Sequence, residues 1–571
     1  MSFLKEKIVE KKTCSMCQEE FSIYEKDLEM LEKMSPEING KKHSFSLPNK
    51  CPECRRKIRY TWRNTNKLFR RKCDATNKDI LAFYGSKVKH PVYDIDYRNT
   101  DRWNPLDYGK DFDFSRPFFE QFSELKDKVP HYSRSILRFE NSDYSNNASD
   151  LKNCYLCFNG GQSEDSYYVI TFKDLLNCVD CFSIDKSENC YECIDVENCN
   201  KVFYSQNSKN CFNSYFIKNC INCSDCFLCK NLSGKKYHIL NKAYGKEEYE
   251  KKVNELLKDN KISNLEKIFK EFSIKLPEKA VNGLNNENIL GDYIYNSKNI
   301  FNSFGIKESE DLRYCSNLKD NSKYLIDVDV FGWDLEKSYN SVVVGHYSDN
   351  LFCCYDCWEN CNNLYYCSSC VRNIKNCFGC VGLHNNYEYC ILNKQYTKED
   401  YEKHVSKIIE NMQKTGEWGE FFPPKLSDYG YNETEGMFFD TMAQDLAIKR
   451  GFNWSSEEIS LPKVEKIIPA SKLPEDIKQI PDDILNRAIE CEITKKPFRI
   501  ITQELEFYRK HNLPIPRRHP DQRHQDRMAL RNPRKLFDRK CDKCGKEIKT
   551  TYAPDKPEIV YCEECYNKEV Y

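Results

Sequence analysis

Long apolar segments are what this sequence most clearly lacks. No run approaches the roughly 20 apolar residues that a membrane-spanning helix needs. The first residues, MSFLKEKIVEKK, also lack the apolar core of a signal peptide. We therefore expect a cytoplasmic protein without a membrane partner.

An excess of charge of either sign is missing as well. Lysine plus arginine and aspartate plus glutamate both count 88, which gives a formal net charge of zero. The overall charge therefore indicates neither a nucleic acid nor a membrane surface as a partner. Any basic surface must be local.

Catalytic motifs are missing too. The chain has no GxSxG, HExxH, P-loop or usable GxGxxG, and its ten histidines are scattered. The stretch LIDVDVFGWD offers Asp327, Asp329 and Asp334, which leaves open a solenoid enzyme acting on carbohydrate. Alternating aspartates are more typical of an exposed polar strand face. We predict no catalytic residues.

Cysteine, in contrast, is abundant, with 32 residues. In a long chain without an export signal, so many cysteines indicate thiolate metal sites or buried thiols rather than disulfides. We expect them to be reduced.

A duplicated segment lies near the two ends of the chain. CRRKIRYTWRNTNKLFRRKC, ending at Cys73, aligns without a gap with QRHQDRMALRNPRKLFDRKC, ending at Cys541, at an offset of 468 residues. The match continues into KCDATNKDI and KCDKCGKEI. This pattern predicts two copies of one module, each made of two ribbon units joined by an arginine-rich segment.

Two of these four units keep four cysteines with the spacing of structural zinc ligands. Structural zinc takes four Cys or His donors in a tetrahedron, usually as pairs separated by two residues. We predict two structural Zn²⁺ sites, with the ligand sets Cys14, Cys17, Cys51 and Cys54, and Cys541, Cys544, Cys562 and Cys565.

The other two units are depleted of ligands. Near Cys73 the second cysteine position is Thr76, and only Asp94 and Asp96 could complete a site of harder ligands. Near Cys491 the ligand positions hold Thr494, His519 and Gln522. One thiolate with carboxylates is a poor structural zinc site. We therefore expect packing alone to hold these units.

The stretch CEITKKPFRIITQELEFYRKHNLPIPRRHPDQR, from Cys491 to Arg523, resembles the bacterial "probable zinc-ribbon" family. That family's pattern is CxxC, phenylalanine, EFY, a Pro-x-Arg step and CPxCR. Cys14 to Arg55 keeps all four cysteines but departs from the EFY segment. More loosely, the chain looks like large uncharacterised zinc-ribbon proteins of small-genome uncultivated bacteria, a resemblance that implies no known activity.

Between the modules the cysteines recur at fixed intervals. Cys157, Cys178, Cys199 and Cys220 lie 21 residues apart, and a later segment repeats every 13 residues from Asn350, Asn363 and Asn376. Units this short bury their apolar side only by stacking on the next unit. We predict a parallel β-solenoid with cysteines inside and ladders of asparagine amides in the turns.

One sequence motif allows a different interpretation. The motif CxxCxxCxxC is formed by Cys220, Cys223, Cys226 and Cys229. It is close to an iron-sulfur cluster pattern, although its last spacing is one residue too short. Whether these cysteines bind metal stays open. Each cysteine-rich array is followed by a similar segment, YHILNKAYGKEEYEKKV or YCILNKQYTKEDYEKHV, which predicts a helix that caps the array.

The fold class predicted is mainly β, a two-part parallel β-solenoid with capping helices, flanked by duplicated zinc-ribbon modules. The predicted boundaries are 1–98 for the N-terminal double module, 99–140 for an aromatic strap, 141–253 for the first solenoid half with its helix, 254–287 for a helical connector, 288–410 for the second half with its helix, 411–484 for an extended strap, and 485–571 for the C-terminal double module.

Basic residues concentrate beside the ribbons. From Lys50 to Cys73 there are ten Lys or Arg against the single acid Glu53, and arginines recur at helical i, i+4 spacing in both copies. Such a face could bind the phosphates of RNA or DNA, with an aromatic side chain stacking on a base. The candidate residues are Arg55, Arg59, Trp62, Arg63, Arg523, Arg527 and Arg531. The alternative is that these arginines pair with acidic residues of the solenoid.

The sequence thus predicts a non-enzymatic zinc-binding scaffold that could contact RNA or DNA through the arginine-rich segments. Two alternatives remain: a protein-interaction scaffold without nucleic acid, and a carbohydrate-acting solenoid enzyme. The physiological partner and the oligomeric state are open.

Overall fold

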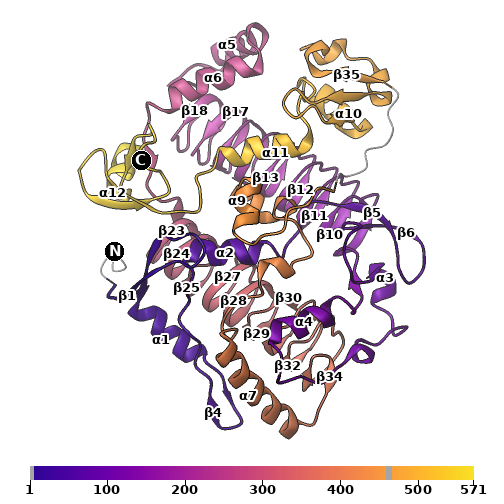
Figure 1. The fold of residues 1–571 in the computed structure, drawn as a ribbon. Coiled ribbons are helices and arrows are strands. Elements are labelled where there is room, and N and C mark those ends of the chain that lie inside the picture. Colours follow the sequence, from indigo (N-terminus) through magenta and orange to yellow (C-terminus); the bar gives the residue numbers. More distant parts are fainter. Residues whose placement is uncertain (1–5, 458–465, 571) are drawn as a thin grey trace.

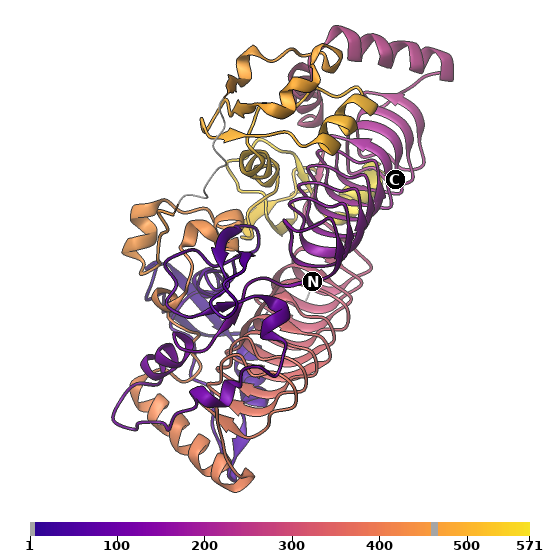
Figure 2. The same ribbon diagram turned by 90° about the vertical axis from the view of Figure 1, so that its right-hand side faces the viewer.

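A computed structural model describes residues 6–457 and 466–570. The chain is mainly β, and most of its strands belong to two large, mostly parallel sheets (Figure 1). Figure 2 shows each sheet as a stack of successive turns of the chain, with the two stacks following one another along the length of the molecule. We call them stack A and stack B.

Stack A is a 12-stranded sheet. Its strands are β9 (Ile136–Glu140), β10 (Asn146–Lys152), β11 (Phe158–Glu164), β12 (Ile170–Leu176), β13 (Phe182–Glu188), β14 (Ile194–Glu197), β15 (Asn200–Phe203), β16 (Gln206–Lys209), β17 (Phe212–Lys218), β18 (Ser224–Lys230), β19 (Lys236–Ile239) and β20 (Lys242–Ala243).

Stack B is a 13-stranded sheet. Its strands are β22 (Gly283–Leu284), β23 (Glu287–Tyr295), β24 (Lys298–Lys307), β25 (Glu310–Arg313), β26 (Ser316–Leu318), β27 (Lys323–Phe331), β28 (Leu335–Gly345), β29 (Ser348–Phe352), β30 (Tyr355–Trp358), β31 (Asn362–Tyr365), β32 (Lys375–Phe378), β33 (Cys390–Ile391) and β34 (Lys394–Gln395).

The register of stack A corrects the predicted 21-residue interval. Phe158 pairs with Ile170, Ile170 with Phe182, and Phe182 with Ile194, so equivalent residues in neighbouring turns lie 12 apart. Within each turn, buried side chains recur every third residue. Because 21 is a multiple of three, the cysteines at that interval all face the interior, but from different sides of the turns.

Backbone conformation explains the frequent Asn-Cys dipeptides. The residue just before each buried position has a positive φ, as in Asn177 (52°) and Asn189 (51°). Asparagine adopts this left-handed region more readily than most residues. The cysteine that follows, such as Cys178 or Cys190, is then fully buried as a small apolar side chain.

The turn asparagines form ladders. Asn198 Nδ2 donates to Asn210 Oδ1 at 2.8 Å, and Asn210 Nδ2 donates to Asn222 Oδ1 at 2.8 Å, in successive turns. Asparagine is favoured at these corners by their left-handed backbone, and the ladders give each asparagine amide a hydrogen-bond partner.

In stack B, buried side chains also recur about every third residue, but over most of its length each turn has 13 residues, one more than in stack A. Leu325 pairs with Ser338, Ser338 with Leu351, and Leu351 with Leu364, each 13 residues apart. The extra residue gives two consecutive positive φ values at one corner, as in Glu359 (69°) and Asn360 (59°).

Helices follow both stacks. After stack A come α5 (Lys246–Asp259) and α6 (Ile262–Ser273), which contact β19 and β18. After stack B comes α7 (Lys398–Thr415), whose N-cap residue Thr397 accepts a hydrogen bond from Asp400 N at 3.2 Å. Buried Tyr401, Val405, Ile408 and Met412 give α7 one apolar face at helical spacing.

The segments expected to be extended straps contain short helices instead. They hold η2 (Pro105–Tyr108), α4 (Phe118–Lys126), η3 (Pro424–Leu426), η4 (Tyr431–Glu433), α8 (Glu435–Phe439), α9 (Gln444–Lys449), η5 (Ala470–Lys472) and η6 (Ile477–Gln479). In α4 the residues Phe118, Phe122 and Leu125 are fully buried at helical spacing. That apolar stripe explains why a helix forms there.

The terminal modules contain four β-hairpins whose turns begin in the same way. The hairpins are β1 (Ile8–Thr13) with β2 (Glu20–Tyr24), β5 (Phe69–Lys72) with β6 (Asp79–Ala82), β36 (Ala488–Glu490) with β37 (Pro497–Phe498), and β38 (Phe537–Lys540) with β39 (Glu547–Thr550). A cysteine directly follows the first strand of each hairpin. We name the units after it: the Cys14, Cys73, Cys491 and Cys541 units.

Helices and short strands complete the modules. They are α1 (Glu25–Met34), β3 (Glu37–Ile38), β4 (Lys41–Lys42), α2 (Pro52–Tyr60), β7 (Val92–Tyr93), α3 (Ile95–Arg98), η7 (Asp482–Asn486), α10 (Thr502–Lys510), α11 (Pro520–Ala529), β40 (Val560–Tyr561) and α12 (Glu563–Val570). Three short strands lie elsewhere: β8 (His131–Tyr132) pairs with β7, β21 (Glu278–Lys279) with β40, and β35 (Ile467–Pro469) with β36. Helices α2 and α11 are the two copies of the arginine-rich segment, and each begins with a proline at its first position.

Candidate metal centres and the arginine contacts beside them

The Cys14 unit brings its four predicted ligands together. Cys14 and Cys17 lie in the hairpin turn, whereas Cys51 and Cys54 lie at the N-terminus of α2. The four sulfur atoms all lie within 4.8 Å of one another, and the Sγ atoms of Cys17 and Cys51 are 3.7 Å apart. A hydrogen bond from Cys54 lowers the pKa of Cys51 to about 5, which favours the thiolate that a metal needs.

The Cys541 unit does the same with a different spacing. Cys541 and Cys544 lie in the turn, and Cys562 and Cys565 lie around the start of α12. Their sulfur atoms also fall within 4.8 Å of one another, with Sγ of Cys544 and Cys562 3.8 Å apart. Cys562 N donates to Cys541 Sγ at 3.3 Å.

These distances fit a tetrahedral ion. Four sulfur atoms about 2.3 Å from a central zinc lie about 3.8 Å from one another. The Cys17–Cys51 and Cys544–Cys562 sulfur distances, 3.7 and 3.8 Å, are close to this value. Each group offers four thiols and no open coordination position, as in a structural site. Two four-cysteine groups are therefore present that could hold a metal ion.

The two depleted units fold without such a group. Asp94 N donates to Cys73 Sγ at 3.3 Å, but the Asp94 carboxylate accepts from Asp96 N at 3.0 Å and caps α3. His519 likewise caps α11, since its Nδ1 accepts from Asp521 N at 3.1 Å. Asp94 and His519 thus bind the backbone at the start of a helix in their own units.

The cysteines of the stacks do not gather in this way. Within residues 6–457 and 466–570, the two sets in the Cys14 and Cys541 units are the groups of three or more possible ligands found close together. Cys220, Cys223, Cys226 and Cys229 are buried at consecutive interior positions around stack A instead. The iron-sulfur interpretation of these four therefore has no geometric support.

The arginines of α2 contact stack B. Arg55 Nε donates to Asp327 Oδ2 at 2.9 Å. Arg59 contacts Asp329 at 2.6 Å and Asp327 at 3.1 Å, and its Nη1 also donates to Asn340, one turn beyond Asp327, at 3.2 Å. Arg59 is fully buried; burial alone would lower its pKa, but the two carboxylates raise it, so the guanidinium stays charged.

The arginines of α11 contact stack A in the equivalent way. Arg523 and Arg527 both pair with Asp180, Arg527 at 3.1 Å, and Arg527 also reaches Glu192, one turn further, at 2.9 Å. Burial raises the pKa of Glu192 to about 7, against the opposing effect of Arg527. Each helix thus inserts arginines four residues apart between polar side chains of successive turns.

The prediction of two exposed basic faces is therefore wrong. Arg55, Arg59, Arg63, Arg523 and Arg527 are buried, and Arg531 is largely buried in an ion pair with Asp195 at 3.1 Å. Trp62 is 5% exposed, with Tyr355 and Phe422 rings 4.8 and 5.3 Å away. The i, i+4 spacing did place these arginines on one face, but that face meets the acids of the stacks. Phosphates have no access to it.

Sequence reasoning missed the acids that receive the arginines. Asp180, Glu192 and Asp195 occupy left-handed corner positions of stack A, and Glu435 at the start of α8 pairs with Arg63 at 2.7 Å. A recognisable signal was present for Asp180, because it is an acid between the buried cysteines of CVDC. The sequence could not indicate that Arg523 binds Asp180, because the two residues are 343 positions apart.

The two modules also contact each other reciprocally. Lys67 pairs with Asp521 at 2.6 Å, and Lys535 pairs with Glu53 at 3.7 Å. At the 468-residue offset, Asp521 is the equivalent of Glu53 and Lys535 the equivalent of Lys67. Such a self-complementary pair of contacts is what a two-fold relation between copies produces. These two ion pairs are therefore reciprocal between equivalent residues of the two modules.

The aspartates considered for catalysis do not form an open site. Asp327 and Asp329 are 1% and 0% exposed and are bound by Arg55 and Arg59. Asp334 lies at a corner and accepts from Asn321 Nδ2 at 3.2 Å. The group that suggested a carbohydrate enzyme is thus part of the contact between α2 and stack B.

Comparisons with known proteins give no family. No family model matches the chain, and no curated protein matches it. A crystal structure from Desulfovibrio desulfuricans G20, of a protein named as an acetyltransferase, aligns at 8% identity over 49% of this chain and 82% of that one, with a TM-score of 0.11. That score is too low for any argument. The resemblance to zinc ribbons stays a prediction.

Within the described ranges, the helices are all too short or too polar to serve as a bilayer-spanning segment.

Proposed function

We propose that this protein is a non-enzymatic zinc-binding scaffold that binds other proteins. In this proposal stacks A and B are the two halves of a parallel β-solenoid, and the terminal modules are zinc ribbons that lock the halves together. The observation that carries the proposal is the pair of four-cysteine groups, one in each terminal module, together with the burial of each module's helical arginines in a stack.

The donor set supports zinc as the metal. Four thiolates in a closed tetrahedron suit Zn²⁺, which has no geometric preference of its own and favours sulfur ligands in structural sites. The ligands Cys14, Cys17, Cys51 and Cys54 would fix the hairpin turn to the start of α2, and Cys541, Cys544, Cys562 and Cys565 would fix theirs to α12. Bound zinc would supply folding energy to both units, with no open position for a reaction.

The pairing interval supports the solenoid. Parallel strands that pair with residues 12 or 13 positions further on leave each turn dependent on its neighbours for burial. The buried, unpaired cysteines of both stacks also favour a reducing compartment such as the cytosol.

The buried arginines favour protein partners over nucleic acid. A protein that binds a phosphate backbone needs exposed lysines and arginines. Here the two most basic segments are used internally, in ion pairs with Asp180, Glu192 and Asp327. The surfaces left for a partner carry charges of both signs, as the paired Lys152–Glu164 and Lys209–Glu197 of stack A show.

Two measurements test the proposal. Elemental analysis of the purified chain should give two zinc ions per molecule, and a protein without zinc would refute the metal assignment. Fluorescence anisotropy with labelled single- and double-stranded RNA and DNA at low salt should show no binding. Binding that weakens steeply with salt would replace the protein-partner proposal by the nucleic-acid one.

A further inference from the structure

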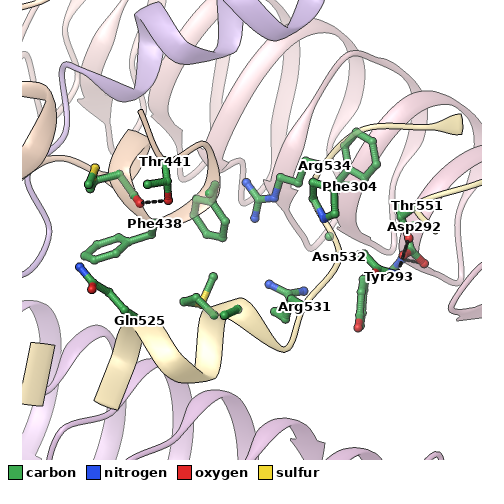
Figure 3. A pocket seen from close by; sticks show the side chains of 16 residues that line it. Asp292, Tyr293, Phe304, Phe438, Thr441, Gln525, Arg531, Asn532, Arg534 and Thr551 are labelled. Atoms are coloured by element: carbon green, nitrogen blue, oxygen red, sulfur yellow. Dashed lines mark hydrogen bonds between the residues drawn. The ribbon is translucent and has the colours of Figure 1, made fainter. Parts of the chain in front are cut away.

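A cavity lies where stack B, α8 and the C-terminal module meet. Its volume is about 340 Å³, within the range of small-molecule sites. Stack B contributes Tyr293 and Phe304, α8 contributes Phe438, and α11 with the segment after it contributes Gln525 and Arg531. Figure 3 shows these side chains around one central space.

One cation in this cavity has no carboxylate partner. Arg534 is 7% exposed and rests on the Phe439 ring, with 3.5 Å from its Cζ to the ring centroid. It donates to the hydroxyl of Tyr60 and to Asn317 Oδ1, which are both neutral. Among the residues that the structure describes, none of the carboxylates forms an ion pair with it. Burial, together with nearby Arg531 and Arg56, lowers the pKa of Arg534.

The other charged groups of the cavity are already satisfied. Arg531 pairs with Asp195 at 3.1 Å and lies over the Tyr293 ring. The carboxylate of Asp292 accepts from Thr551 Oγ1 at 2.7 Å and from Asn282 N at 2.7 Å, so both of its oxygens are engaged by the surrounding protein. Within the described residues, the lining thus holds one cation without an ion pair, Arg534, and one anion without an ion pair, Asp292, whose partners are all neutral donors.

Burying a guanidinium without an opposite charge costs free energy, because the group loses its hydration. An anion that binds beside the guanidinium offsets this desolvation cost. Three of its five N–H groups have no protein acceptor within the described ranges. In Figure 3 the guanidinium groups of Arg531 and Arg534 point toward the central space, with Phe438 on the far side. The aromatic lining suits a planar ring, since rings pack favourably against one another.

We propose that this cavity binds a small anion attached to an aromatic ring, with the anionic group at Arg534 and the ring beside Phe438 and Tyr293. Either a phosphate or a carboxylate would supply the anion. The ligand would enter past the exposed residues Thr441, Gln525 and Ala529. The site would join stack B to α8 and α11, so its ligand would also tie these elements together.

Isothermal titration calorimetry on the full chain tests the proposal with four probes. Adenosine monophosphate carries a phosphate and a ring, benzoate carries a carboxylate and a ring, adenosine has the ring alone, and inorganic phosphate has the anion alone. We expect at least one of the first two to bind with Kd below about 1 mM, and at least tenfold more tightly than adenosine and phosphate. Equal binding of adenosine or phosphate, or no binding of either ring-bearing anion, would overturn the proposal.

Two neighbouring tryptophan variants locate the site without touching Arg534. Ala529 lines the cavity and is exposed, so Ala529→Trp should fill the entrance and weaken the bound anion at least tenfold. Leu530, the next residue, is 63% exposed and lies outside the cavity lining, so Leu530→Trp should change Kd less than twofold. An unchanged Kd in Ala529→Trp would place any binding elsewhere and refute the site.

Discussion

The Cys541 and Cys73 units allow a direct comparison of one hairpin with its metal ligands and one without. Cys562 N donates to Cys541 Sγ at 3.3 Å, and Asp94 N donates to Cys73 Sγ at the same distance. Both turns also close through the residue four positions after the cysteine, Gly545 (φ 74°) and Asn77 (φ 59°). The backbone is conserved between the units although three of the four thiols are not.

What differs is how the two units are held. The Cys73 unit contributes Leu68, Ile80, Ala82 and Phe83 to a buried cluster that includes Phe158, Ile170 and Phe182 of stack A. The cluster around the Cys541 unit is smaller and includes Cys541 and Cys562 themselves. We therefore expect the Cys73 unit to keep its fold through apolar contact alone, and the Cys541 unit, with less contact, to depend on a metal bound by its thiolates.

Removing one ligand from the intact unit should have the largest effect. We expect Cys562→Ser to lower the zinc content from two ions to one and to unfold residues 541–566 locally, because structural zinc contributes of order 10 kcal/mol to such units. Limited proteolysis with elemental analysis measures both outcomes. The matched variant Cys73→Ser should leave the zinc content unchanged. Equal zinc loss in both variants would contradict the comparison.

Separating a module from its stack should be the next largest effect. Arg59→Met leaves Asp329 buried without its cation, and breaking a buried pair in this way costs about 3–5 kcal/mol. Urea unfolding followed by fluorescence should show the loss. The control is Arg138→Met, since the Arg138–Asp150 pair has half-exposed side chains and should contribute less than about 1 kcal/mol. Similar losses in both variants would mean that the α2 contact is not structural.

The depleted unit should regain a metal site when its ligands are restored. Thr76, Asp94 and Tyr97 stand where Cys544, Cys562 and Cys565 stand in the other copy. Because the turn geometry is preserved, we expect the triple variant Thr76→Cys, Asp94→Cys, Tyr97→Cys to bind a third zinc ion. Elemental analysis gives the count, and cobalt substitution would show the absorption of a tetrahedral thiolate site. A count that remains at two would show that the unit's backbone has diverged more than the hydrogen bonds indicate.

The smallest effect concerns the pH dependence of the two arginine contacts. Glu192 in stack A has the position that the neutral Asn340 has in stack B. Its folded pKa of about 7 lies above the usual 4.5, so its contribution to stability is present below pH 4.5 and is lost as pH rises through about 7. Glu192→Gln should therefore reduce the fall in stability between those pH values, as measured by urea unfolding across that range. An unchanged slope would show that Glu192 does not titrate there.

The sequence was sufficient for the features that repeat locally. The 468-residue offset located both modules, and the cysteine spacing located both four-thiol groups. The 12-residue turn was missed because the interior positions recur every third residue and carry cysteine, serine, valine and isoleucine alike. The left-handed corners give the buried positions a period of three, whereas an ordinary strand has a period of two.

The partners of the arginines could not be predicted for a different reason. Arg59 reaches Asp329 across 270 residues, and Arg527 reaches Glu192 across 335. The i, i+4 spacing shows that the arginines share one helix face, but it does not show what covers that face. Because the overall charge is neutral, the arginine face could be either solvated or buried. Only the packing of α2 and α11 against the stacks decides between them.

Hydrogen exchange with and without a zinc chelator tests the central claim most directly. Removing zinc should expose the amides of residues 14–54 and 541–566 to exchange, while those of residues 69–97 and 488–519 stay protected, because packing alone holds the depleted units. Equal loss of protection in all four units, or no loss in any, would contradict the account of two metal-dependent and two metal-independent hairpins.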